Sequence, residues 1–316
     1  MKVLVTGGAG FIGSQVAKAL VARGDDVVIV DNVNDYYDPT LKEARLREVV
    51  PESVPFYKVD ITDYEALSNI CKEHNFDAIC HLAAQAGVRY SLQNPHAYEQ
   101  TNNQGTLNML ELARHNGIKN VIYASSSSVY GGNTKVPFAE SDPVEKPISL
   151  YAATKRANEL MAYTYHHLYG LNCTGLRFFT VYGPYGRPDM ALFLFTKAIL
   201  ENKAIDVFNY GDMERDFTYV DDIVAGVLAA IDKSCPYEIF NLGGDHPVKL
   251  SYFIECIEKK LGKEAEKNLL PIQPGDVPRT MADLTKAKKI LGFNPQTKIE
   301  EGIHNFIVWY KEFYKQ

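Results

Sequence analysis

Seven residues near the N-terminus, Gly7-Gly8-Ala9-Gly10-Phe11-Ile12-Gly13, lie between an apolar strand-like segment and a helical one. In such a turn the first glycine permits the tight bend, the second lets the backbone approach a pyrophosphate, and the third lets the helix pack against the strand. The first helical N–H groups, at Phe11 and Ile12, have no partner within the helix and favour an anion. The spacing of Gly7, Gly10 and Gly13 in this context predicts a dinucleotide-binding turn.

Apolar strand-like runs alternate with helical patterns through the first half of the chain. The predicted strands are Val3–Val5, Val27–Val30, Phe56–Val59, Ala78–Cys80, Val121–Ala124 and Thr174–Arg177. The predicted helices cover 12–23, 63–73, 98–116 and 151–169. This alternation predicts an α/β fold, a doubly wound parallel sheet of the Rossmann type with helices on both faces.

The sequence changes in character after residue 178. A turn-rich stretch runs from Gly183 to Asp189, and further proline-containing turns follow at Pro247 and 271–278. Short helical patterns at 190–202, 251–261 and 284–291 lie between these turns. We expect residues 1–178 to form the dinucleotide-binding domain. We expect 179–316 to form mainly a smaller substrate-binding lobe, with some of its strands interleaved with the large sheet.

Asp31 ends the second predicted strand, and Asn32 follows it. A carboxylate at this place accepts hydrogen bonds from the adenosine ribose hydroxyls and repels a 2′-phosphate, so it favours NAD over NADP. Asp60 and Ile61 follow the third predicted strand, where the chain can meet the adenine. We therefore expect NAD as the cofactor, with these four residues at its adenosine end.

Tyr151 and Lys155 lie four residues apart at the start of a predicted helix and share one of its faces. A free tyrosine has a pKa of about 10, which is too high for a base at neutral pH. A nearby lysine ammonium and the positive nicotinamide ring would favour the phenolate and lower this pKa. We expect Tyr151 to accept a hydroxyl proton while hydride leaves the same carbon, and Lys155 to bond the nicotinamide ribose.

Four serines, Ser125-Ser126-Ser127-Ser128, directly follow the predicted strand Val121–Ala124. Ligands bind at the carboxyl ends of the strands in such sheets, so a hydroxyl here can orient the reacting proton. We assign this role to Ser126 and expect at least one of the four serines to be structural.

The composition argues against several kinds of partner. The chain has 316 residues, a net charge of −6 and a pI near 5.8, which disfavour a nucleic-acid or anionic-membrane surface. No apolar run approaches ~18 residues, so no membrane span is expected. The five cysteines are scattered, without a CxxC pair or a His/Cys cluster. We therefore expect reduced thiols, a cytoplasmic location and no metal site.

The glycine turn, the serine run, Val129-Tyr130-Gly131 and the pair of Tyr151 and Lys155 together resemble the extended short-chain dehydrogenase/reductase family. Two later segments resemble its nucleotide-sugar branch: Arg177-Phe178-Phe179-Thr180-Val181-Tyr182-Gly183-Pro184 and Arg215-Asp216-Phe217-Thr218-Tyr219-Val220-Asp221-Asp222. Within that branch the chain is most similar to UDP-glucuronate 4-epimerases. The segments that carry this similarity are 31–38, 81–91 and 186–191.

The resemblance implies roles for further residues, with Ser126, Tyr151 and Lys155 as the catalytic set. The cofactor would be contacted by Leu82, Ala83, Ala84, Asn102 and Phe178. The UDP-sugar would be bound by Arg89, Val207, Phe208, Asn209, Arg215 and Arg279, with the last two on the pyrophosphate and 207–209 near the uracil. Family members commonly dimerise by pairing two helices from each subunit. We therefore expect a homodimer through the helices near 98–116 and 151–169.

Two positions depart from sister families. The sugar-nucleotide dehydratases carry Asp-Glu just before their Val-Tyr-Gly, and the UDP-glucuronate decarboxylases carry Glu there, whereas this chain has Ser127 and Ser128. Neutral hydroxyl donors suit a sugar carboxylate, which another carboxylate would repel. Thr180, in place of an Asn seen in UDP-galactose 4-epimerases, and Arg187 are further candidates for binding that carboxylate.

The resemblance therefore implies NAD-dependent conversion of UDP-glucuronate to UDP-galacturonate through a transient 4-keto sugar. Three alternatives stay open on the sequence. The chain could be a 4-epimerase of neutral UDP-hexoses or UDP-N-acetylhexosamines, a UDP-glucuronate decarboxylase, or, from another class, a non-catalytic NAD-binding sensor. Ser128 disfavours decarboxylation, and the presence of both Tyr151 and Lys155 disfavours the sensor.

Overall fold

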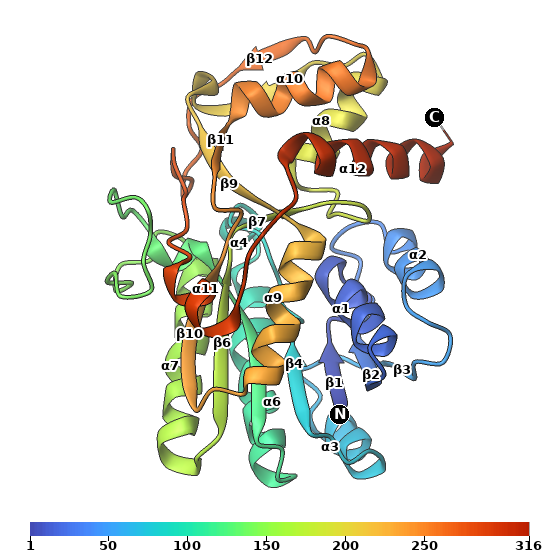
Figure 1. The fold of residues 1–316 in the computed structure, drawn as a ribbon, viewed down its shortest axis with the longest axis vertical. Coiled ribbons are helices and arrows are strands. Elements are labelled where there is room, and N and C mark those ends of the chain that lie inside the picture. Colours follow the sequence, from blue (N-terminus) through green and yellow to red (C-terminus); the bar gives the residue numbers. More distant parts are fainter. Residues whose placement is uncertain (316) are drawn as a thin grey trace.

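Seven parallel strands form the central sheet of the computed structural model, which describes residues 1–315 (Figure 1). They are β1 (Lys2–Thr6), β2 (Asp26–Asp31), β3 (Phe56–Lys58), β4 (Ala78–His81), β5 (Asn120–Ser126), β6 (Asn172–Phe178) and β10 (Tyr237–Leu242). Their order across the sheet is β10-β6-β5-β4-β1-β2-β3, and every neighbouring pair is parallel. The predicted α/β fold with a doubly wound parallel sheet is confirmed.

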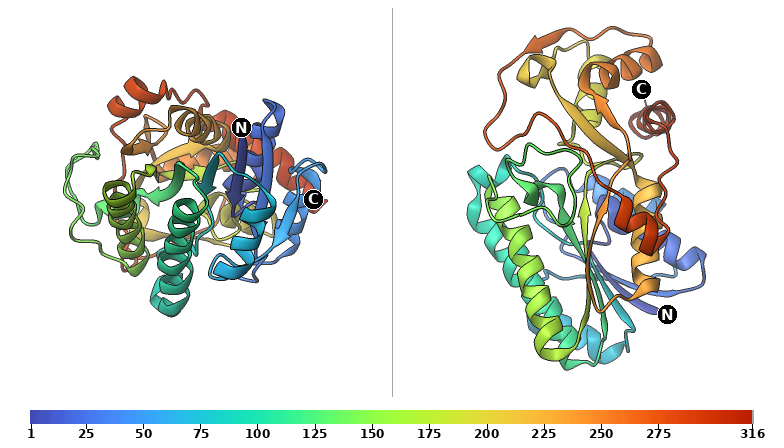
Figure 2. Two further views of the ribbon diagram at one scale, coloured as in Figure 1. Left: turned by 90° about the horizontal axis from the view of Figure 1, so that it is seen from below. Right: turned by 60° about the vertical axis from the view of Figure 1, so that its left-hand side comes forward.

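Helices cover both faces of this sheet, as the views in Figure 2 show. On one face lie α1 (Phe11–Ala22) and α9 (Val220–Lys233), and on the other lie α3 (Tyr64–Glu73), α6 (Gly105–His115) and α7 (Leu150–Tyr169). Alternate residues of β1 point to opposite faces, because successive side chains of a strand do so. Val3 and Val5 pack with α1 in one buried cluster, while Leu4 packs with α6 in the other.

A smaller lobe lies beyond the carboxyl ends of the large sheet (Figure 1). It contains the three-stranded sheet β11-β9-β7 and the two-stranded sheet β12-β8. Its elements are β7 (Thr180–Tyr182), α8 (Ala191–Leu200), β8 (Ile205–Val207), η3 (Phe208–Gly211), β9 (Glu214–Tyr219), β11 (Pro247–Lys249), α10 (Leu250–Leu261), β12 (Lys267–Leu269) and α12 (Ile299–Tyr314). Helix α11 (Thr285–Leu291), although late in the chain, packs against α9 and β10 of the large domain. The chain therefore passes from β9 of the lobe back to the large domain for α9 and β10, and returns to the lobe at β11.

Between the strands of the large sheet the remaining elements are α2 (Thr40–Glu48), α4 (Tyr90–Gln93), α5 (Pro95–Tyr98), the π-helical turn η1 (Glu99–Gln104) and the 3₁₀ turn η2 (Ser127–Tyr130). The single helix predicted over 98–116 is wrong in detail, because η1 interrupts it before α6 begins. Such π-helical turns often occur at functional sites. Asn102, an expected cofactor residue, lies within this one.

None of the helices formed by residues 1–315 has the length and apolar character needed to cross a membrane. Within the same residues, no group of three or more His, Cys, Asp and Glu side chains gathers in a way that could hold a metal ion.

Candidate active site

The glycine-rich turn can fold back tightly on itself only because side chains are missing from it. Gly7 has φ +74°, and the N–H of Gly10 donates to the carbonyl of Gly7 at 2.9 Å. A Cβ atom at Gly13 would lie 2.1 Å from that same carbonyl oxygen. No side chain caps the N-terminus of α1, so its first N–H groups, including those of Phe11 and Ile12, are available to an anion. The turn therefore fits the pyrophosphate of a dinucleotide.

Asp31 lies at the carboxyl end of β2, beside this turn. Its Oδ2 atom accepts a hydrogen bond from the Ala9 N–H at 3.1 Å, and its Oδ1 atom accepts one from the Val33 N–H at 2.8 Å. Both carboxylate oxygens retain a further lone pair for a ribose hydroxyl. Asn32 donates to the Oδ2 atom of Asp60 at 2.6 Å. The four residues expected at the adenosine end thus lie together, since Ile61 is the direct neighbour of Asp60.

Two of the expected cofactor residues have side chains that are already engaged by the protein. Ile61 is buried against Gly105, where a Cβ atom would lie 2.3 Å from the Ile61 Cδ1 atom. Asn102 is 1 % exposed, and its amide bonds Gln85 and the Thr154 hydroxyl. Only the backbone of Ile61 is left for a cofactor, and Asn102 orders the segment that follows β4.

That segment carries Leu82, Ala83 and Ala84. The N–H groups of Leu82 and Ala83 donate to the backbone carbonyl and the hydroxyl of Thr6, each at 3.2 Å. A Cβ atom on Gly7 would lie 2.8 Å from the Ala83 nitrogen. The segment after β4 therefore lies directly against the glycine turn.

Helix α7 begins with a hydrogen bond from the Ala152 N–H to the hydroxyl of Ser149, its N-terminal cap. Lys155 is buried, and its ammonium donates to the backbone carbonyl of Ala124 at 2.8 Å. Burial lowers the pKa of Lys155 to about 8. The lysine is thus fixed against the end of β5, directly before the serine run.

Tyr151 is half-buried in the first turn of α7. The pKa of its phenol lies above its ordinary value, because burial raises it by more than the Ser126 hydroxyl and the charge of Arg187 lower it. The sequence predicted Lys155 as the cation that lowers this pKa. In the structure the cation that acts on this pKa is Arg187, while the ammonium of Lys155 donates to the Ala124 carbonyl, and the role of Lys155 toward the phenol stays a prediction.

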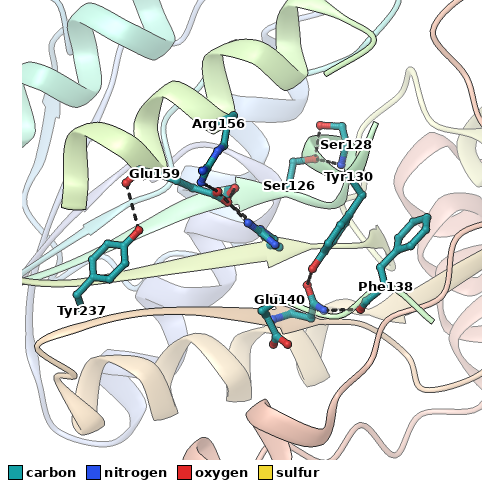
Figure 3. Close-up of polar contacts among 11 residues, drawn as sticks. Ser126, Ser128, Tyr130, Phe138, Glu140, Arg156, Glu159 and Tyr237 are labelled. Carbon is teal, nitrogen blue, oxygen red and sulfur yellow. Dashed lines mark hydrogen bonds and ion pairs between the residues drawn. The ribbon is translucent and has the colours of Figure 1, made fainter. Parts of the chain in front are cut away.

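Ser126 ends β5 and caps the 3₁₀ turn η2 (Figure 3). Its hydroxyl oxygen accepts hydrogen bonds from the Ser128 N–H at 3.2 Å and from the Ser128 hydroxyl at 2.9 Å. With the oxygen occupied by two donors, the proton of Ser126 is left for Tyr151. Ser128 was expected to donate to a sugar carboxylate, but its hydroxyl donates to Ser126 instead. Ser127 is the first residue of the same turn.

Arg187 and Thr180 line one small hollow beside β7, together with Met190 and Phe193. The guanidinium of Arg187 forms a two-pronged ion pair with Asp189, with an Nε–Oδ1 distance of 3.0 Å and an Nη2–Oδ2 distance of 2.5 Å. The hydroxyl of Tyr36 also donates to Asp189, at 3.2 Å. The sequence analysis did not predict Asp189 or Tyr36 as site residues. The spacing of Arg187 and Asp189, two residues apart, was the one signal from which their ion pair could have been predicted.

The arginines expected to bind the pyrophosphate lie on the small lobe. Arg215 in β9 is held by Asp276 at 2.8 Å and by the carbonyl of Pro278 at 3.0 Å. Burial and, more weakly, the charge of Arg89 lower the pKa of Arg215. Arg279 is 61 % exposed and pairs with Glu214 at 3.5 Å. Three arginines, Arg89, Arg215 and Arg279, thus share this region with the carboxylates of Asp276 and Glu214, and the excess of positive charge suits a diphosphate.

The residues expected near the uracil lie at the end of β8. Val207 is buried in the core, so its side chain is not exposed to a ligand. The ring of Phe208 lies under the guanidinium of Arg89, 4.7 Å from its carbon. Asn209 has φ +50° and its amide donates to the Asp212 carbonyl at 2.7 Å. Phe178, expected to contact the cofactor, ends β6 and is 9 % exposed.

Comparison with known proteins supplies the family. Residues 3–243 match the NAD dependent epimerase/dehydratase family. The chain belongs to this family. Within the NAD dependent epimerase/dehydratase family it is 49% identical over 311 residues to the UDP-glucuronate 4-epimerase of Thermodesulfobacterium geofontis, which covers 98% of this chain and 96% of that protein.

Two solved structures are similar over the whole length of the chain. The UDP-glucuronic acid 4-epimerase from Bacillus cereus, in complex with UDP-glucuronic acid and NAD, has a TM-score of 0.94 at 34% identity and covers 99% of this chain and 100% of that one. The UDP-glucose 4-epimerase of Thermotoga maritima, with UDP-glucose, has a TM-score of 0.90 at 32% identity, with coverage of 99% and 100%. One of these two proteins of the same fold is bound to an acidic sugar nucleotide and the other to a neutral one, so the fold does not by itself determine which sugar is bound.

Proposed function

We propose that this chain is an NAD-dependent 4-epimerase that converts UDP-glucuronate into UDP-galacturonate. The observation that carries the proposal is the set of side chains that act on Tyr151. A tyrosine with a serine donor faces Arg187, which shares a hollow with Thr180, and no acidic side chain stands at positions 127 and 128. The similarity to UDP-glucuronate 4-epimerases supports the same conclusion.

The glycine turn, Asp31 and the segment after β4 would hold the cofactor. Gly7, Gly10 and Gly13 bring the backbone and the α1 N-terminus to the pyrophosphate, and Asp31 takes the adenosine ribose. NAD+ held by these residues would supply the redox chemistry, as acceptor and then donor of a hydride at C4 of the sugar. Asn102 acts through Gln85 and Thr154, the neighbours that its amide bonds.

Tyr151 moves the proton that accompanies this redox chemistry. As the C4–H bond gives up its electron pair, Tyr151 accepts the proton of the 4-hydroxyl and C4 becomes a carbonyl. Ser126 donates to the tyrosine oxygen and stabilises the phenolate that must exist before the transfer. The 4-keto sugar then rotates within the site and presents its opposite face. Tyr151 returns the proton, and the product differs from the substrate only at C4.

Thr180 and Arg187 bind the sugar carboxylate. A 4-keto group activates that carboxylate toward loss of CO2, so it must be held in an orientation that does not favour C–C cleavage. Asp189 occupies the Nε atom and one donor of the Nη2 atom of Arg187, so the Nη1 group is left to donate to the sugar carboxylate. The hydroxyl of Thr180 offers a further donor from the neighbouring strand. Ser127 and Ser128 bear no charge, so the turn that carries them does not repel the carboxylate of the substrate.

The two lobes bind different parts of the ligands. Residues 1–178 carry most of the cofactor-binding and catalytic groups, and 179–316 carry Arg215 and Arg279 for the UDP pyrophosphate. The ring of Phe208 and the backbone of 207–209 lie at the uracil end. Arg89 reaches this cluster from the large domain, since its charge acts on Arg215.

Incubation of the purified protein with UDP-glucuronate, UDP-glucose and UDP-N-acetylglucosamine in separate reactions tests the proposal. NMR of the sugar identifies the C4 epimer, and product mass reveals any loss of CO2. Conversion of UDP-glucuronate alone to its epimer is the expected result. Turnover of only the neutral sugars, release of a UDP-pentose, or no turnover of any of the three would each contradict it.

We further propose a cytoplasmic homodimer. Leu160, Tyr163 and Leu168 recur along one side of α7 and are 53 %, 52 % and 59 % exposed. Exposed large apolar side chains that line one helix face are typical of a protein interface. The adjacent helix α6 packs beside α7, so the two helices of one subunit can pair with those of a second copy.

A further inference from the structure

A buried ion pair lies behind the serine run. Glu159 in α7 and Arg177 in β6 are 0 % and 1 % exposed, and they meet through two hydrogen bonds of 2.8 Å and 2.9 Å. Burial would raise the pKa of Glu159, but Arg177, Ser125 and Arg156 bring it below its ordinary value. The carboxylate is therefore ionised and fixed by partners from three elements.

One of these partners is the first serine of the run. The hydroxyl of Ser125 donates to the Oε1 atom of Glu159 at 2.7 Å, and both groups are buried. Arg156 donates to the Oε2 atom at 2.9 Å (Figure 3). Ser125 is covalently next to Ser126, so any shift of its hydrogen bond moves the serine that faces Tyr151.

The same helix face carries the catalytic residues. Tyr151, Lys155 and Glu159 follow one another at intervals of four residues, which places them on one side of α7. Lys155 bonds the Ala124 carbonyl and Glu159 bonds the Ser125 hydroxyl, so two successive residues of β5 are tied to two successive turns of α7.

Burial of this ion pair is a poor way to gain stability. Replacing such a pair with apolar side chains of similar volume is often neutral or stabilising. The Nη1 atom of Arg177 even lacks a hydrogen-bond partner among the described residues and lies near the ring of Tyr130, whose centroid is 4.8 Å from the guanidinium carbon. A two-pronged guanidinium–carboxylate contact does, however, fix the mutual orientation of the elements that carry it.

We propose that Ser125 and Glu159 are positioning residues, which with Arg177 hold β5 against α7 so that Ser126 faces Tyr151. This inference rests on the proposed function, because it assigns a purpose to the geometry of that site. The groups that face the Tyr151 phenol are Ser126 from β5, Arg187 from the loop after β7, and Tyr98 from α5, whose ring centroid lies 6.0 Å away. Lys155 lies on the same helix.

Ser125→Ala is the most informative variant because it leaves the ion pair in place. We expect kcat to fall about tenfold through the loosened Ser126–Tyr151 contact, with KM within about twofold because the UDP-binding arginines are untouched. Weaker donation from Ser126 raises the Tyr151 pKa, so the acid limb of the kcat profile moves up by about half a pH unit. A merely structural serine would leave that limb in place.

Thr174→Val serves as the matched control. Thr174 lies in β6, is fully buried, and has a hydroxyl without a partner among the described residues, so its loss removes a buried hydroxyl but no hydrogen bond. This variant should keep the wild-type pH profile. The double variant E159L/R177M removes the charges together, avoiding the unpaired ion that Glu159→Gln would leave, and it should fold while showing the same upward shift as Ser125→Ala.

Titration of tyrosinate by ultraviolet absorbance gives a readout that needs no substrate. The chain has 20 tyrosines, so the Tyr151→Phe variant is subtracted to isolate the phenol of Tyr151. A higher Tyr151 pKa in Ser125→Ala and in E159L/R177M supports the inference. Unchanged titration in both variants, with an unmoved pH profile, overturns it. Failure of the wild type to epimerise UDP-glucuronate would instead overturn the proposed function, while the titration would still decide the positioning role.

Discussion

The guanidinium of Arg187 lies close enough to the phenol of Tyr151 to lower its pKa, although the two side chains come from different lobes. Tyr151 begins a helix of the large domain, and Arg187 follows the first strand of the small one. Arg187 is also the group that we assign to the sugar carboxylate. Occupation of the substrate site by an anion would therefore change the charge that the catalytic tyrosine experiences.

Arg187→Met should damage both functions. Loss of the positive charge raises the Tyr151 pKa, so the acid limb of the kcat profile moves to higher pH, and loss of two donors raises KM for UDP-glucuronate by about tenfold. Steady-state kinetics across pH test this. Arg187→Lys keeps the charge but not the planar pair of donors, and it should restore the pH profile without restoring KM. A normal profile in Arg187→Met would contradict the assignment.

Thr180→Ala should release CO2 from the substrate. Without the Thr180 hydroxyl the carboxylate rotates more freely while C4 is a carbonyl, and a 4-keto-pentose nucleotide accumulates. Mass spectrometry of the products detects this species, and Thr180→Ser, which keeps the hydroxyl, is the control. If Thr180→Ala forms no pentose and keeps wild-type affinity for UDP-glucuronate, Thr180 has no role in holding the carboxylate.

Lys155→Met should abolish turnover yet stabilise the ligand-free protein. Burial lowers the pKa of Lys155 from 10.5 to about 8, so below pH 8 the folded protein bears the full penalty of a buried charge. Removing that charge should raise the free energy of unfolding at neutral pH by about 2 kcal/mol. Between about pH 8 and 10.5 the folded wild type binds fewer protons than its unfolded chain, so its stability rises with pH and the advantage shrinks. Denaturant unfolding across pH measures the difference.

Arg215→Ala should weaken binding of every UDP-sugar to a similar degree. The arginine is placed for the pyrophosphate, which all candidate substrates share, so KM should rise by about tenfold or more while the Tyr151 pH limb stays in place. Loss of the bond to Asp276 also loosens the loop that carries Arg279. Calorimetric titration with UDP alone tests the assignment, and unchanged UDP affinity would be inconsistent with it.

Leu160→Glu should dissociate the proposed dimer. A charge placed on the exposed apolar face of α7 opposes burial against a second copy. Sedimentation velocity should show the monomer for this variant and the dimer for the wild type. Leu269→Glu is the matched control, since Leu269 is 55 % exposed on β12 in the small lobe. A wild-type chain that sediments as a monomer would refute the proposal.

The large domain was predictable because most of its strands, β3 and β10 excepted, are buried on both sides. Runs such as Val27–Val30 are continuously apolar, and glycine spacing marks the turn that follows the first strand. The six predicted strands all occur in the central sheet. The seventh strand, β10, lies at the edge of the sheet, and the polar residues Glu238 and Asn241 interrupt its apolar residues. It therefore has no continuous apolar run from which a buried strand could be predicted.

The candidate site was predictable where chemistry follows local spacing. Tyr151, Lys155 and the serine run are placed by one helix and one strand end. The partners that tune them come from distant segments: Arg187 acts on Tyr151, and the Glu159 carboxylate bonds a serine 34 residues earlier. Such contacts depend on the tertiary fold, which periodicity does not encode. The fixed Lys155 ammonium is a further case, because its direction depends on the crossing of α7 over β5.

The position of β10 has a consequence for how the protein is made. Strands β1 to β6 are synthesised first, but the free edge of β6 stays unpaired until Tyr237–Leu242 have been synthesised. By then much of the small lobe has already left the ribosome. Helix α9, which covers one face of the sheet, is delivered equally late. A nascent chain halted near residue 178 therefore exposes an unpaired strand and an uncovered apolar face, a state open to misassembly. A minimal cofactor module for engineering must accordingly include residues 220–242.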